Sequence, residues 1–258
     1  MGHFRSRETV ESALRMSDDG VPDRVNAELH GVALRTIRTW RRRYRTEGRT
    51  RGGSGYPATP CPHCDGADLN EAAYALLLGW YLGDGSIARA RRGVFTLQIV
   101  NDERYSDLNG EITETIKRVK PNASPCLRGG GGAIRVEARW KHWPCVFPQH
   151  GPGRKHLRRI ELEPWQRAIV AKYPEQLVRG LFHSDGCRVV NWASKPGRDK
   201  RYEYVRYMFS NRSDDIRKIL TDALDILGIA WRRPRWDHVA VSRKEAVAAL
   251  DVFVGPKS

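Results

Sequence analysis

The chain has 258 residues, of which 40% are hydrophobic, and a formal net charge of +15. This length supports one large core or two to three modest domains, and eight Trp with nine Tyr indicate a folded protein. The charge favours a polyanionic partner, and nucleic acid fits best because the basic residues are spread over several segments. The sequence lacks an apolar run of about 20 residues and a signal-peptide core, so it predicts no membrane span. Five cysteines, an odd number, favour a reduced cytoplasmic protein, which we expect to associate with the bacterial nucleoid.

The first 50 residues (1–50) predict a small helix-turn-helix domain. The segment RETVESALRMSDDG is amphipathic and ends at Gly20, VPDRVNAELHG ends at Gly31, and VALRTIRTWRRRYRTEG follows as a third helix. A turn that contains glycine, followed by a helix with a basic outer face, is typical of this DNA-binding motif. A solvated charged helix is the alternative interpretation. The candidate DNA-binding residues of this domain are Arg35, Arg38, Arg41, Arg42, Arg43 and Arg45.

Residues 51–69 predict a linker, because they are rich in Gly, Pro and small polar residues. The linker contains CPHC, in which Cys61 and Cys64 have the spacing of half a zinc site. The candidates for the two further ligands are Cys126, Cys145, His63 and His142. A turn with two free thiols is the other interpretation of this motif.

The remaining chain predicts one structural plan repeated twice, over residues 70–165 and 166–258. In each half we expect a helix, two strands, a helix, two strands and a closing helix. Both halves open with an apolar helix that stops at an Asp-Gly pair, LLLGWYLGDG in the first and LVRGLFHSDG in the second. The acids Asp84 and Asp185 therefore occupy the same place in each repeat.

Small residues recur one helical turn apart in both opening helices. Gly79 and Gly83 are four residues apart, as are Gly180 and Ser184, so each pair lies on one helix face. Small residues let two helix backbones approach closely, and this packing would bring the two terminal acids together. Adjacent carboxylates repel each other unless a cation joins them, and a divalent metal ion would do so. The alternative is two buried helices that each end at an ordinary Asp-Gly turn.

These two segments resemble the paired motifs of the LAGLIDADG homing endonucleases, in the single-chain form with two motifs. The order of domains also resembles actinobacterial proteins that join a helix-turn-helix to LAGLIDADG domains. The resemblance implies an α+β fold of two pseudo-symmetric αββαββα halves packed through the motif helices. It further implies Mg²⁺ or Mn²⁺ as cofactor, with Asp84 and Asp185 as ligands and Gly83 and Ser184 as contributors of close contacts and backbone carbonyls. The basic and polar residues that it implies near the reaction are Lys141, Arg243 or Lys244, Gln98 and Asn211.

Two further basic groups predict contacts with DNA phosphates or grooves. They are Arg154, Lys155, Arg158 and Arg159 between the halves, and Arg206, Arg232, Arg233 and Arg235 on or beside strands of the second half. A solvated linker is the alternative for the first group. We expect a monomer that binds double-stranded DNA and cleaves its phosphodiester bonds. The competing hypotheses are a transcription regulator that binds DNA without cutting it and, with less support, an RNA-binding module.

Overall fold

The computed structural model describes residues 7–47, 60–194 and 201–257. The chain divides into two compact units, Met1–Thr59 and Pro60–Ser258. Each unit has its own cluster of buried hydrophobic residues. Within the described residues, none of the helices has the length and apolar character that crossing a membrane requires.

Unit 1 contains three helices, α1 (Arg7–Asp18), α2 (Asp23–Leu29) and α3 (Leu34–Glu47). Its core is formed by Ala13, Ala27 and Ile37, one from each helix, with Val32 and Trp40 packed against them. The buried Asn26 side chain donates hydrogen bonds to the Ala13 carbonyl (2.7 Å) and to the Ser17 hydroxyl (2.9 Å). The turns between helices contain Gly20 and Gly31 at positive φ, where L side chains are strained. The three expected helices are therefore present, with their apolar faces turned inward.

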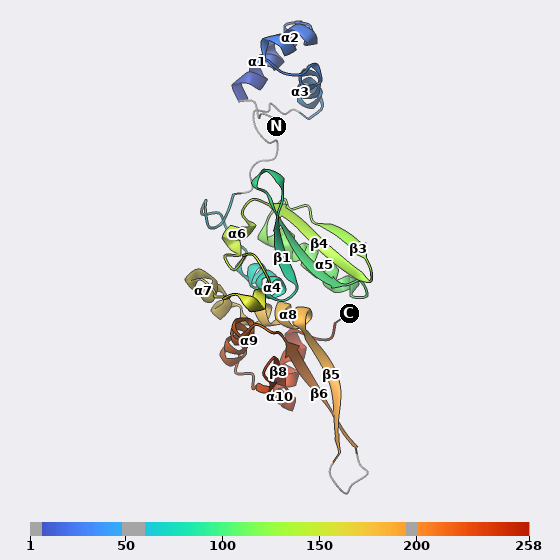
Figure 1. Ribbon diagram of the computed structural model, residues 1–258, viewed down its shortest axis with the longest axis vertical. Helices are drawn as coiled ribbons and strands as arrows, with labels where there is room; N and C mark the ends of the chain where they lie inside the picture. Colours follow the sequence, from blue (N-terminus) through green and yellow to red (C-terminus); the bar gives the residue numbers. More distant parts are fainter. Residues whose placement is uncertain (1–6, 48–59, 195–200, 258) are drawn as a thin grey trace. The chain divides into compact units, whose positions relative to one another are not determined.

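Unit 2 consists of two halves with the same order of elements. The first contains α4 (Glu71–Leu82), β1 (Gly85–Arg89), β2 (Phe95–Asp102), α5 (Ser106–Val119), β3 (Cys126–Gly130), β4 (Ala133–Trp140) and α6 (Trp143–Val146). The second contains α8 (Pro174–Asp185), β5 (Gly186–Ser194), β6 (Arg201–Ser210), α9 (Asp214–Ile226), β7 (Arg232–Arg235), β8 (His238–Val241) and α10 (Lys244–Phe253). The antiparallel sheets have equivalent strand orders, β1-β2-β4-β3 and β5-β6-β8-β7. The predicted α+β fold of two αββαββα halves is confirmed (Figure 1).

The segment that connects the halves is more ordered than the sequence predicted. It contains a short 3-10 turn, Lys155–Leu157, and a helix that we did not predict, α7 (Pro164–Lys172). Pro164 occupies the first helical turn, and the Glu163 and Gln166 side chains form a capping box. Gln166 is fully buried and donates to the Tyr74 hydroxyl at 2.6 Å. The connection is therefore part of the core of unit 2.

The helices α4 and α8 lie side by side at the centre of unit 2 (Figure 1). A Cβ atom added to Gly79 would lie 2.9 Å from Gly180 Cα, and one added to Gly180 would lie 3.0 Å from Gly79 Cα. Side chains at these positions do not fit, so the two backbones are in direct contact. Every α4 residue from Ala73 to Leu82 is buried, because the helix is surrounded by other elements. This explains why its sequence is apolar on all sides.

Candidate functional site

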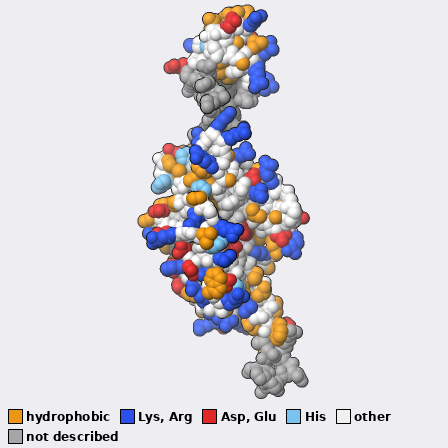
Figure 2. Space-filling model, viewed as in Figure 1, with side chains coloured by type: hydrophobic (Ala, Val, Ile, Leu, Met, Phe, Trp, Pro, Cys, Tyr) orange, Lys and Arg blue, Asp and Glu red, His pale blue; other side chains and the backbone are white. Residues whose placement is uncertain are grey.

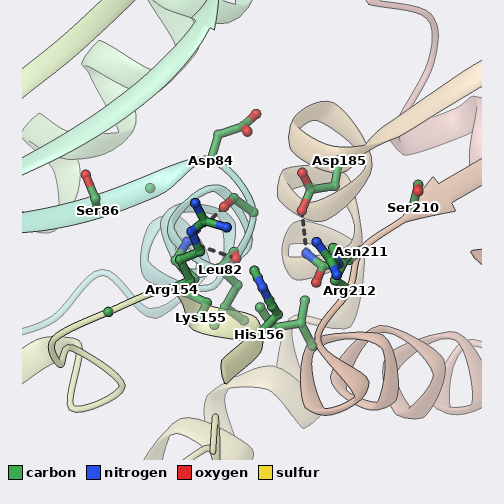
Figure 3. A pocket seen from close by; sticks show the side chains of 14 residues that line it. Leu82, Asp84, Ser86, Arg154, Lys155, His156, Asp185, Ser210, Asn211 and Arg212 are labelled. Carbon is green, nitrogen blue, oxygen red and sulfur yellow. Dashed lines mark hydrogen bonds between the residues drawn. The ribbon is translucent and has the colours of Figure 1, made fainter. Parts of the chain in front are cut away.

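The C-terminal ends of α4 and α8 bring the two predicted acids to one place. Asp84 follows Gly83, the residue that caps α4, and Asp185 is the last residue of α8. A Cβ atom added to Gly83 would lie 2.5 Å from Ser184 Cβ and 3.2 Å from the Asp185 Oδ2 atom. The two helix ends are therefore in contact, and both acids line one cavity of about 500 Å³ (Figure 3).

The cavity opens onto the outer faces of both sheets. Ser86 of β1 and Ser210 of β6 line it. In the register of the first sheet Ser86 is level with Gln98 and alternates with the buried Ile87, so Ser86 lies on the face away from the core. Arg154 and Arg212, both exposed, also line the cavity. A polyanion on the sheet faces would thus meet the carboxylates at this opening.

The two carboxylates have different hydrogen-bond partners. Asn211 donates to Asp185 Oδ2 at 2.6 Å, and its own Oδ1 accepts from the Ser213 backbone at 2.8 Å (Figure 3). By register Asn101 is the counterpart of Asn211 in the first half, but its amide donates to Asn109 at 3.3 Å. Among the described residues, no side-chain amide donates to Asp84. The predicted residue Asn211 therefore contacts one acid only.

Burial raises the pKa of both acids. The pKa of Asp84 rises to about 6, mainly through burial and also through the charge of Asp185, while Lys257 and Lys155 oppose the rise. Burial also raises the pKa of Asp185, and the hydrogen bond from Asn211 opposes this shift. The raised pKa values indicate two half-buried carboxylates whose negative charges are incompletely neutralised by the protein.

Two lysines reach the same helix ends. The Lys155 ammonium donates to the carbonyls of Gly83 (2.8 Å), Leu82 (3.0 Å) and Tyr81. The Lys257 ammonium donates to the Ser184 carbonyl at 3.1 Å. Each motif helix therefore ends on an ammonium group, which is favourable at the negative end of a helix dipole. Burial lowers the pKa of Lys155 to about 8, and the two acids oppose this shift.

These lysines change the assignment made from the sequence. Lys155 was predicted to contact DNA phosphates, but its ammonium is held inside the carboxylate site. Lys257 was not identified, because it lies in the C-terminal segment after α10 and belongs to no motif. The carbonyls of Gly83 and Ser184, which the resemblance implies as metal ligands, are the ones that accept from these two lysines.

The donor set fits a divalent cation. Carboxylate and carbonyl oxygens are the ligands that Mg²⁺ and Mn²⁺ prefer, and the two helix ends supply both kinds. The ammonium groups already occupy positions where the protein attracts positive charge. A metal ion that bound to the Gly83 and Ser184 carbonyls would have to displace the two ammonium groups.

Lys141 and Lys244 do not reach the acids, and this corrects their assignment as catalytic groups. Val136 is the β4 residue level with Ile99 and Gly85, and Lys141 lies five residues further along the chain. At about 3.3 Å per residue along a strand, this places Lys141 roughly 16 Å from the level of Gly85, the residue next to Asp84.

The second half has the same arrangement, in which Val239 is level with Phe209 and Gly186. Lys244 lies five residues beyond Val239, past the end of β8, and the alternative Arg243 lies four residues beyond it. The position after the last strand is therefore at the opposite end of each sheet from the acids.

Gln98 lies on the outer face of the first sheet, one strand away from the cavity. It is paired with Ser86, which lines the cavity, and its amide donates to Glu137 Oε1 at 3.2 Å. Glu137 also accepts from Arg128 at 3.0 Å. Gln98 is therefore part of a polar network on the sheet and does not contact either acid.

The predicted basic residues of unit 2 have different environments. Arg158 donates to the Gln149 carbonyl and Arg159 pairs with Glu161, so these two are engaged within the protein. Arg206 lies on the outer face of the second sheet, and its Nε atom is buried without a hydrogen-bond partner in the described part of the chain. The exposed arginines of β7 are Arg232, Arg233 and Arg235.

The outer face of the first sheet has a basic group that the sequence analysis missed. Arg128 and Arg135 are paired in register between β3 and β4, and Arg139 lies on the same face of β4. Their alternation with the buried Val136 and Ala138 was the available signal. Figure 2 shows that Lys and Arg side chains are distributed over the visible face of unit 2.

In unit 1 the predicted DNA-binding arginines lie on α3. Asp23 binds Arg41 at 2.6 Å and is 3.5 Å from Arg38. Arg35 and Arg42 are exposed. The side chains of Arg43 and Arg45 lie outside the described residues.

The similarity of this chain to known proteins lies in its structure. No protein-family model matches the sequence, and no curated protein matches it. Among solved structures, the chain is similar to the LAGLIDADG meganuclease I-AabMI bound to uncleaved DNA, with 13% identity and a TM-score of 0.44 over 70% of this chain and 82% of that one.

It is also similar to I-DmoI in complex with DNA and Ca (13% identity, TM-score 0.43, 72% of this chain and 91% of that one). A third similar structure is the homing endonuclease I-WcaI bound to its DNA recognition sequence (16% identity, TM-score 0.45, 74% of this chain and 84% of that one).

Proposed function

We propose that the chain binds double-stranded DNA and cleaves its phosphodiester bonds with divalent metal ions held by Asp84 and Asp185. The observation that carries this proposal is the meeting of two half-buried carboxylates at one cavity between two sheets whose outer faces are basic. Carboxylates withdrawn from water are costly unless they are paired or bind a cation, which favours a cation at this site. A monomer would suffice, because both acids belong to one chain.

The residues of the site have separable roles in this reaction. Mg²⁺ or Mn²⁺, when bound, would lower the pKa of a water molecule and stabilise negative charge on the phosphate. Asp84 and Asp185 would hold the ion, and Asn211 fixes the orientation of Asp185 through its 2.6 Å hydrogen bond. Arg154 and Arg212 at the cavity opening would bind the flanking phosphates.

The two lysines partly offset the charge of the acids. Lys155 and Lys257 hold their ammonium groups on the carbonyls at the helix ends. If these carbonyls were to hold a metal ion, Lys155 and Lys257 would have to leave them, and their ammonium groups would then be available to a phosphate in the cavity. The negative charges of the two acids favour the charged form of both lysines, whereas burial lowers the pKa of each lysine.

The outer faces of the sheets are the proposed DNA surface, and α3 of unit 1 would read a second segment. β-strands that carry exposed arginines can lie in the major groove, as the recognition helix of a helix-turn-helix does. DNA as the partner is consistent with a cytoplasmic, nucleoid-associated protein.

Cleavage of plasmid libraries that carry randomised targets tests the proposal. We expect the wild-type chain to linearise a subset of plasmids in Mg²⁺ or Mn²⁺, and the Asp84→Asn and Asp185→Asn variants to lose this activity. Asp222→Asn is the matched control, because Asp222 is an exposed acid of α9 that pairs with Lys218. Cleavage that persists in both site variants would refute the assignment of the acids.

A DNA-binding regulator that does not cut is the second candidate, and one observation favours it. The carbonyls needed for a metal ion are already occupied by ammonium groups, so the acids are partly neutralised without metal. If the wild-type chain selects a DNA sequence but leaves it intact in both metals, the regulator is the correct assignment. The lysines would then be permanent partners of the acids.

A further inference from the structure

We propose that unit 2 contains a second, structural metal site, a zinc centre formed by Cys61, Cys64, His142 and Cys145. The sequence supplied only half of this site and left several candidates for the remainder. The structure brings one ligand atom from each of these four residues within 4.8 Å of one another. This site is separate from the carboxylate cavity and does not depend on the proposed nuclease activity.

The distances between ligand atoms match those of a tetrahedral zinc site. Cys64 Sγ lies 3.5 Å from Cys145 Sγ, and Cys145 Sγ lies 3.6 Å from His142 Nδ1. Zn–S bonds of about 2.3 Å and Zn–N bonds of about 2.0 Å place tetrahedral sulfur atoms about 3.8 Å apart and S and N about 3.5 Å apart. The four groups are therefore spaced to surround a zinc ion with little movement.

The local backbone presents each pair of ligands on one side of a turn. The Cys61 carbonyl accepts from the Asp65 amide at 2.8 Å, and the Asp65 carboxylate accepts from the Cys61 amide at 2.7 Å. This closes the CPHC turn. On the other side, Cys145 N–H donates to the His142 carbonyl at 3.0 Å, so the two residues face the same way at the start of α6. The two pairs converge from segments about 80 residues apart in the chain.

The chemistry of the ligands indicates a structural ion. Three thiolates and one imidazole fill all four positions of a tetrahedral site, which leaves no place for a catalytic water molecule. The site also lies far from the acids. Gly85, next to Asp84, pairs with Ile99 of β2, whereas Trp140, two residues before His142, pairs with Phe95 at the start of β2. The ion would cross-link the first residues of unit 2 to α6 and so fix where the chain enters this unit.

The remaining cysteines provide matched controls. Cys126 and Cys187 are exposed on β3 and β5 and lie outside the cluster. His63, which is part of the CPHC motif, stacks on Trp165 with ring centroids 6.2 Å apart. The four groups left open by the sequence are thus distinguished: His142 and Cys145 join the cluster, whereas Cys126 and His63 do not.

Metal analysis of the full chain, purified under reducing conditions without added metal, tests the proposal. We expect one zinc ion per chain in the wild type and in the Cys126→Ser and Cys187→Ser variants, and loss of zinc in Cys64→Ser and Cys145→Ser. The Asp84→Asn, Asp185→Asn double variant should retain its zinc, which separates this site from the carboxylate site. A wild-type chain that holds no zinc, even after an equimolar addition in reducing buffer, would overturn the proposal.

A second measurement uses the wild-type chain alone and so does not depend on the folding of variants. Replacement of zinc by Co²⁺ should give the visible absorption of tetrahedral cobalt with thiolate charge-transfer bands. Removal of the metal with a chelator should lower the Tm of unit 2, and Zn²⁺ but not Mg²⁺ should restore it. Octahedral cobalt spectra, or zinc loss in the Cys126→Ser variant equal to that in Cys145→Ser, would contradict the four-ligand assignment.

Discussion

The close contact between α4 and α8 gives a quantitative prediction for Gly79→Ala. A Cβ at this position would lie 2.9 Å from both Gly180 Cα and Leu181 N, whereas ordinary contacts begin near 3.4 Å. These are backbone atoms, so a side-chain rotation does not relieve the overlap and the helices must separate. Overpacking of this kind costs up to about 3 kcal/mol, and we expect the upper end because both helices are buried along the contact.

Gly110→Ala is the matched control for this substitution. Gly110 lies inside α5, and a Cβ added there meets no atom within 4 Å. Both substitutions gain the same helix propensity, about 0.5 to 1 kcal/mol, so the difference between the two variants isolates the steric cost. For a unit of this size a difference of about 3 kcal/mol corresponds to a difference in Tm of roughly 6 to 12 °C.

Thermal unfolding followed by near-UV circular dichroism measures this difference. The buried Trp80 and Trp143 report on unit 2. We expect Gly110→Ala to unfold at or slightly above the wild-type Tm, and Gly79→Ala well below it. Equal Tm values for the two variants would refute the direct backbone contact on which the meeting of the acids depends.

Three further predictions concern the charges of the site and the proposed DNA surface. Lys155→Met should strengthen Mn²⁺ binding at least roughly tenfold in equilibrium titrations. The reason is that unit charges about 4 Å apart repel each other by about 4 kcal/mol at an effective dielectric constant of 20. Lys172→Met, on the surface, should leave Mn²⁺ binding unchanged. In metal-free protein, Asp84→Asn should stabilise unit 2 at pH 8 by about 3 kcal/mol and have little effect at pH 4 in urea unfolding. The reason is that the folded protein loses stability as the pH rises through about 6, where the carboxyl of Asp84 with its raised pKa becomes charged. Asp102, whose pKa is lowered to about 2 by Arg104, stabilises the protein when charged, so Asp102→Asn should change stability at pH 8 with the opposite sign. The same sign for both variants would contradict the assignment. Arg232→Gln should weaken DNA binding and reduce the slope of log K against log salt by about 0.9 for each phosphate that the arginine neutralises, and an unchanged slope in a binding titration would exclude Arg232 from the interface.

The sequence predicted the features that repeat. The two motif helices, the small residues on their contact face and the paired acids were all visible because each occurs twice at equivalent positions. The strand β1 was expected from the repeated plan, but its residues were not assigned, since Gly85–Arg89 is short and follows the motif without a turn signal. Helix α7 was also missed, because a segment with four basic residues was interpreted as a linker.

The assignments that failed depended on register and burial, which a single sequence does not specify. Lys141 and Lys244 follow the last strand of each half, but antiparallel pairing places that position at the opposite end of the sheet from the acids. Lys155 lies among other basic residues in the sequence, and no local pattern indicated that its ammonium, rather than theirs, binds the carbonyls at the end of α4. Lys257 reaches the site from the end of the chain, and His142 and Cys145 complete the cysteine cluster only through tertiary contact.

Titration with Mn²⁺, followed by electron paramagnetic resonance, tests the central claim that Asp84 and Asp185 together bind a divalent cation. We predict saturable binding by the wild-type chain, its loss in the Asp84→Asn, Asp185→Asn double variant, and its retention in Asp222→Asn. Binding of equal strength in the double variant, or no binding by the wild type up to millimolar Mn²⁺, would contradict the claim.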